Sequence, residues 1–192
     1  MSSLVIAGDT SGQVTIAAPA VAGTNTLTLQ AATATNAVNT LATAVASTSG
    51  TAIDFTALPS WVKRITVQFS GVSLSASAQI LIQLGTGSTT YTTSGYIGTT
   101  AACQAAGVSI VSSTSGFVVF NPAAAGIISG HMIITNISGN NWVSSHAAKR
   151  DTSTVVTGGS DVSLGAVLTA VRITSSSTDT FDAGTVNILY EG

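Results

Sequence analysis

The side chains that could act as acids, bases or nucleophiles are few in this sequence. His131 and His146 are its two histidines, and Cys103 is its single cysteine. With 26 serines, a Ser-His-Asp combination can be assembled on paper, but no serine lies in the G-x-S-x-G turn that exposes a nucleophile in hydrolases. Catalysis needs such groups to converge on one pocket. We therefore expect a protein that is not an enzyme.

The patterns that bind metals and phosphates are also missing. The sequence has no Cys-x-x-Cys or His-Glu-x-x-His arrangement. Asp179 and Asp182 precede Gly184, but they lack the spacing and the bidentate Glu of a calcium loop. Their pattern is more typical of a turn that leads into a strand. The glycines at Gly85 and Gly87 are not followed by the lysine of a phosphate-binding loop. We expect no metal ion and no cofactor.

Aromatic side chains offer a different chemistry, the stacking of sugar rings. Trp142, Tyr91 and Tyr96 would contact a glycan if they shared one exposed face. In a β-sandwich, however, large aromatic residues more often belong to the core or its rim. Both interpretations are open at the level of the sequence.

The composition is unusually poor in charge. Only 6% of the 192 residues are charged, against about 25% in an average soluble domain. No Asp, Glu, Lys or Arg occurs between Arg64 and Lys149, while Ser and Thr number 26 and 30. A mean hydropathy of +0.51 argues against disorder, which combines low hydrophobicity with high charge. We expect a hydroxyl-rich surface that other subunits partly cover. The alternative is an ordinary β domain whose low charge is the result of evolutionary drift.

The same composition excludes several classes of protein. Five scattered basic residues cannot neutralise many phosphates, so nucleic-acid binding is not expected. A disulfide within the chain needs a second cysteine, and no apolar run approaches the roughly 18 residues of a membrane-spanning helix. The first residues do not resemble a secretory signal. We expect assembly in a cytoplasm and no membrane partner.

The elements that must position these residues are mostly strands, because β-branched Thr, Val and Ile dominate. Ile65, Val67 and Phe69 alternate with polar residues, as in a half-buried strand. Similar segments lie at residues 64–69, 80–84, 117–120, 131–137, 141–145, 171–174 and 185–190. With turn residues between them, they predict an all-β fold: an antiparallel β-sandwich or barrel, with a jelly-roll-like body. The one candidate helix is the Ala-rich stretch 30–46.

A change in composition near Ser47 divides the chain into an expected arm, residues 1–46, and a β-sandwich body, residues 47–192. Short strands are expected at 4–7, 13–16 and 24–29. Such strands need a partner to pack on, so the arm is expected to attach the protein to a neighbouring chain. Alternatively, these residues complete the same sandwich. The expected contacts of the arm are Leu4, Val5, Ile6, Val14, Ile16, Leu27 and Leu29.

Three segments resemble a family of small tailed-bacteriophage virion proteins, of the head-decoration, cement or short-fibre type. They are residues 8–29, 51–67 and 179–191, so the resemblance extends from near the first residue to near the last. It implies a compact β module, often a homotrimer, that an N-terminal arm attaches to the major capsid protein or another virion protein. It implies no catalytic residue.

The resemblance and the composition together give two expectations for function. The first is a decoration or cement protein on the virion exterior that acts by passive oligomeric packing. The alternative is a short tail fibre or tip module that binds a host-surface glycan through an exposed aromatic cluster.

Overall fold

The computed structural model describes residues 3–7, 13–17, 38–121, 123–124 and 126–192. It divides the chain into two compact units, Met1–Asn36 and Ala37–Gly192. The first unit contains a hairpin of β1 (Ser3–Ala7) and β2 (Gln13–Ala17), in which Leu4 is opposite Ile16. Two of the three expected arm strands are thereby confirmed. The third, with Leu27 and Leu29, lies outside the described residues.

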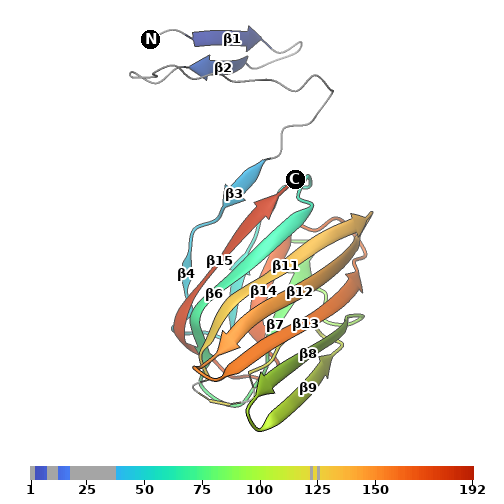
Figure 1. Cartoon of the computed structure of the whole chain (residues 1–192). Helices are drawn as coiled ribbons and strands as arrows, with labels where there is room; N and C mark the ends of the chain where they lie inside the picture. Colours follow the sequence, from blue (N-terminus) through green and yellow to red (C-terminus); the bar gives the residue numbers. More distant parts are fainter. Residues whose placement is uncertain (1–2, 8–12, 18–37, 122, 125) are drawn as a thin grey trace. The chain divides into compact units, whose positions relative to one another are not determined.

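The second unit is an antiparallel β-sandwich, which confirms the expected all-β class, while the jelly-roll-like body stays a prediction (Figure 1). The larger sheet has nine strands: β3 (Asn39–Leu41), β4 (Val45–Ala46), β6 (Arg64–Leu74), β8 (Ile97–Gln104), β9 (Gly107–Ser113), β11 (Ile128–Ser138), β12 (Asn141–Arg150), β13 (Thr154–Ser163) and β15 (Phe181–Glu191). The smaller sheet has four: β5 (Ala52–Phe55), β7 (Ile80–Gly85), β10 (Phe117–Val119) and β14 (Ala170–Ser175).

The order of strands in the larger sheet is β3-β15-β6-β11-β12-β13-β8-β9, and β4 also pairs with β15. The order in the smaller sheet is β10-β7-β14-β5. All the strand pairs are antiparallel. Strand β9 therefore lies at one edge of the larger sheet, and β3 lies at the other (Figure 1).

The alternation in the sequence sets which residues fill the core between the two sheets. Ile65, Val67 and Phe69 of β6 are buried, while Arg64 and Gln68 are exposed. Strand β7 departs from the expected alternation because it is buried on both faces. The chain between β9 and β10 passes close to its second face, so a Cβ at Gly116 would touch Leu81 and Gln83.

The expected boundary after Ala46 is not where the two units meet, because residues 38–46 belong to the second unit. Val38 N–H donates to the Gly192 carbonyl at 3.0 Å, and Ala42 N–H donates to the Ile188 carbonyl at 2.9 Å. The helical interpretation of this part is wrong for the same reason: β3 and β4 hydrogen bond to the edge of β15. Among the described residues, no helix is long and apolar enough to cross a membrane.

Candidate assembly surface

The two histidines lie on opposite faces of the larger sheet. His146, on the inner face of β12, is 6% exposed, and its Nε2 lies 3.0 Å from Thr100 Oγ1 on β8. The ring reaches across β13 at Gly158, where a Cβ would lie 2.6 Å from His146 Cε1. Burial lowers the pKa of His146 to about 4, so its ring is neutral near pH 7. Its surroundings are those of a core residue.

The side chains that ligate metals are not gathered in the part of the chain that the structure describes. His131 is exposed on β11, and no group of three or more His, Cys, Asp or Glu residues could hold a metal ion there. Cys103 is exposed on β8 and is not in a disulfide.

Two of the three residues expected to contact a glycan are buried, and that expectation is wrong for them. Trp142 is 3% exposed and Tyr96 is 1% exposed, so neither ring presents a face to solvent. The Tyr96 hydroxyl accepts a hydrogen bond from Leu84 N–H at 2.8 Å. Strand β10 begins with Phe117 opposite Ile82 and does not extend to Leu84, so the hydroxyl takes the place of a strand partner for Leu84.

Tyr91, the third expected glycan contact, is half-buried and already covered by a cation. The Arg172 guanidinium lies 4.0 Å from the centre of the Tyr91 ring. Arg172 also donates two hydrogen bonds to the Asp54 carboxylate, both at 2.8 Å. Burial, followed by the charge of Asp54, raises the pKa of Tyr91. This ring face is occupied by the protein itself, not free for a sugar.

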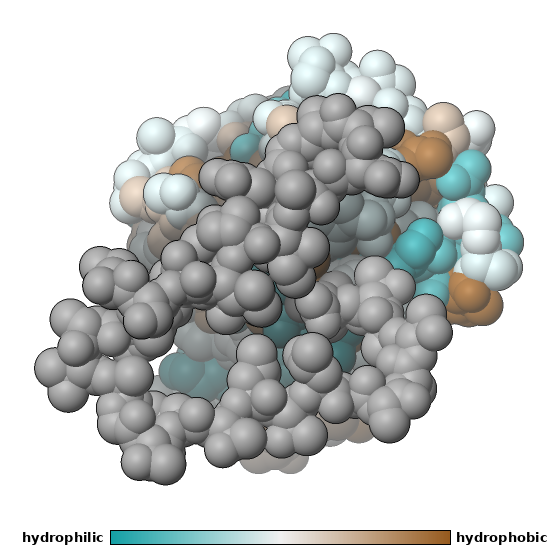
Figure 2. Space-filling view, turned by 90° about the horizontal axis from the view of Figure 1, so that it is seen from above, coloured by the Kyte–Doolittle hydropathy of each residue, from teal (hydrophilic) through white to brown (hydrophobic). Residues whose placement is uncertain are grey.

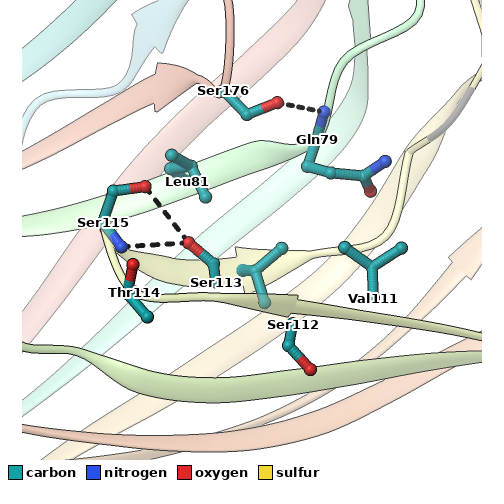
Figure 3. A pocket seen from close by; sticks show the side chains of 9 residues that line it. Gln79, Leu81, Val111, Ser112, Ser113, Thr114, Ser115 and Ser176 are labelled. Atoms are coloured by element: carbon teal, nitrogen blue, oxygen red, sulfur yellow. Dashed lines mark hydrogen bonds between the residues drawn. The ribbon is translucent and has the colours of Figure 1, made fainter.

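A pocket of about 340 Å³ lies between β7, β9 and β10 (Figure 3). Its lining is Gln79, Leu81, Val111, Ser112, Ser113, Thr114, Ser115, Val118 and Ser176. The hydroxyls of Ser113 and Ser115 bond to each other at 3.2 Å, and Gln79 Oε1 accepts from Asn121 N–H at 2.7 Å. The lining contains neither a charged group nor an aromatic ring.

The outer face of the larger sheet carries few charged residues, as the composition predicts. Charged residues lie near strand ends, as for Lys149, Asp161 and the pair Arg64–Glu191, whose Nε and Oε2 are 3.4 Å apart. The positions between them hold Thr66, Gln68, Thr99, Ala101, His131, Ile133, Thr135, Val143, Ser145, Ala147, Thr157 and Gly159. The described residues that are visible from above in Figure 2 include pale, teal and brown ones.

At the β9 end of this face, apolar residues of three neighbouring strands adjoin one another. In the register, Val108 of β9 is opposite Cys103 of β8, which is opposite Val155 of β13; Ile110 is opposite Ala101. Val108, Ile110 and Val155 are 64%, 67% and 59% exposed. We call these five residues the edge patch. An exposed apolar cluster of this kind is typical of a surface that contacts another molecule.

The sequence interpretation missed the edge patch because it did not assign strands β8, β9 and β13. The available signal was the β-branched content of this segment, at Val108, Ile110 and Val111. Comparison with protein-family models, curated proteins and solved structures gave no match to the chain.

Proposed function

We propose that this chain is a structural protein of a bacteriophage virion, which decorates or cements the exterior of the capsid by passive packing. The observation that carries the proposal is the outer face of the larger sheet, which is nearly uncharged and ends in the edge patch. The resemblance of three segments to tailed-phage virion proteins supports the location.

The physical advantage of such a surface is that it can be covered at little electrostatic cost. Burying an unpaired charge requires several kcal/mol of desolvation, whereas Thr, Ser and Ala positions of a paired sheet keep their backbone hydrogen bonds. The apolar edge patch gains free energy when water leaves it. Contacts of this kind depend little on salt, since few exposed charges are there to be screened.

Binding to the particle tests this proposal. Purified chain added to particles that lack it should bind them and raise their melting temperature. Because the surface carries few charges, the binding constant should change less than about threefold between 50 and 500 mM salt. Cys103, the chain's single cysteine, lies in the edge patch, so maleimide should label it more slowly on the particle than in free chain. Failure to bind the particle would contradict the proposed function.

The N-terminal unit is the proposed attachment arm. A variant of residues 37–192 should fold, because the described core lies entirely within that range. We expect this variant to show the circular dichroism of the intact body and to lose binding to the particle. Full incorporation of the shortened chain would instead show that the body alone makes the attachment.

A further inference from the structure

The edge strands of the two sheets differ in how well they are protected. An exposed edge is a template for another strand, and proteins usually protect it by short length, charge, proline or a bulge. Strands β3, β10 and β5 have three, three and four residues, and β5 carries Asp54 in its pair with Arg172.

Strand β9 has none of these protections. Its seven residues include no charged residue and no proline, and its pairing with β8 runs from Gly107 to Ser113 without a shift in register. Among the described residues, no strand other than β8 pairs with β9. Its outer N–H and C=O groups are strong hydrogen-bonding groups, and the protein element whose backbone matches them is another β-strand.

The absence of charge on β9 narrows the choice of partner strand. A charged side chain in that strand would lie beside Val108 or Ile110, and β9 offers no opposite charge. An uncharged strand with small hydroxyl residues between apolar ones fits, and β9 itself has that composition. We propose that β9 pairs antiparallel with β9 of a second copy, about a two-fold axis at Ile110.

This register is complementary to itself. Ile110 lies opposite Ile110 of the second copy, while Val108 lies opposite Ser112 and Ser109 opposite Val111. Each branched side chain other than Ile110 therefore meets a serine on the same face. The pairing joins two nine-stranded sheets into one and brings the two nearly uncharged outer faces side by side. It relates copies in pairs, whether or not a three-fold contact forms elsewhere. This inference rests on the proposed function, because it names a second copy of the chain as the molecule that contacts the assembly surface.

A charge exchange at residue 110 tests the pairing directly, because only this register places residue 110 opposite itself. By analytical ultracentrifugation, the full-length wild type should associate with increasing concentration. Ile110→Lys alone, or Ile110→Glu alone, should weaken that association by about tenfold, since like charges lie directly opposite each other. An equimolar mixture of the two variants should restore association between them.

Ile137→Lys is the matched control, because Ile137 is 65% exposed on β11 of the same sheet; it should associate as the wild type does. Melting curves of all three variants check that each is folded. The pairing is overturned if Ile110→Lys associates as tightly as Ile137→Lys, or if the wild type remains a monomer up to about 1 mM. The second result would leave a strand of a different protein as the occupant. Binding of the same variants to particles is measured separately, so failure of the pairing is distinguishable from failure of the proposed function.

Discussion

Replacing Trp142 with alanine is expected to lower the free energy of unfolding by about 3–5 kcal/mol, the cost usual for removing a large buried aromatic side chain. Trp142 is 3% exposed and belongs to the main hydrophobic core. It also lines a small pocket of about 50 Å³ with Val62 and Leu168, which the truncation would enlarge. Urea denaturation followed by circular dichroism measures the change.

Trp61→Ala is the control, because the Trp61 side chain is 38% exposed. It packs on Tyr190 with ring centres 5.9 Å apart, so we expect a loss of about 1 kcal/mol for this partly exposed contact. A Trp142→Ala protein within 1 kcal/mol of the wild type would contradict the burial described here. Because Trp142→Ala damages the core, a loss of glycan binding in this variant would not show that Trp142 contacts a glycan.

Lowering the pH from 6.5 to 4 is expected to cost about 3 kcal/mol of stability through His146 alone. Its pKa is about 4 in the folded protein and about 6.5 in an unfolded chain. Between these values the unfolded chain binds a proton that the folded protein does not, so stability falls as the pH falls. The contribution of His146 is fully present above pH 6.5 and is lost by pH 4. Urea titrations at intervals of half a pH unit measure the slope.

His146→Gln separates this effect from the titration of carboxylates. Glutamine can still bond to the Thr100 hydroxyl, which lies 3.0 Å from the imidazole Nε2, but it does not titrate. The variant should show a flatter profile between pH 6.5 and 4. Equal slopes for the wild type and His146→Gln would mean that the folded protein does not hold His146 neutral.

The strands that could be predicted from the sequence are those with large β-branched or aromatic residues at alternate positions. Arg64–Leu74 and Phe181–Glu191 are examples, because Ile65, Val67, Val186 and Ile188 leave an unmistakable apolar face. Strand β8 gave no such signal: its inner positions are held by Gly98, Thr100 and Ala102. Small residues suffice there because neighbouring side chains fill the space, as His146 does above Gly158.

The sequence could predict that the protein has a surface with little charge, but not which strands form that surface. The absence of charge from Ile65 to Ala148 indicates a neutral surface wherever that segment is exposed. It cannot tell which strand lies at an edge, because that depends on pairing between segments far apart in the sequence. For the same reason, the sequence does not show which aromatic residues are buried. Trp142 shares the inner face of β12 with Ser144 and His146. Because these two neighbours are polar, the sequence does not show that this face is buried.

The hydrogen bonds between Val38 and Gly192 have a practical consequence. They place the C-terminal residue beside β3, at the opposite edge of the larger sheet from β9. A peptide or fluorescent protein fused after Gly192 would therefore extend from the edge that β9 does not use. The chain is suited to carrying foreign cargo at its C-terminus without blocking the strand through which copies are proposed to join.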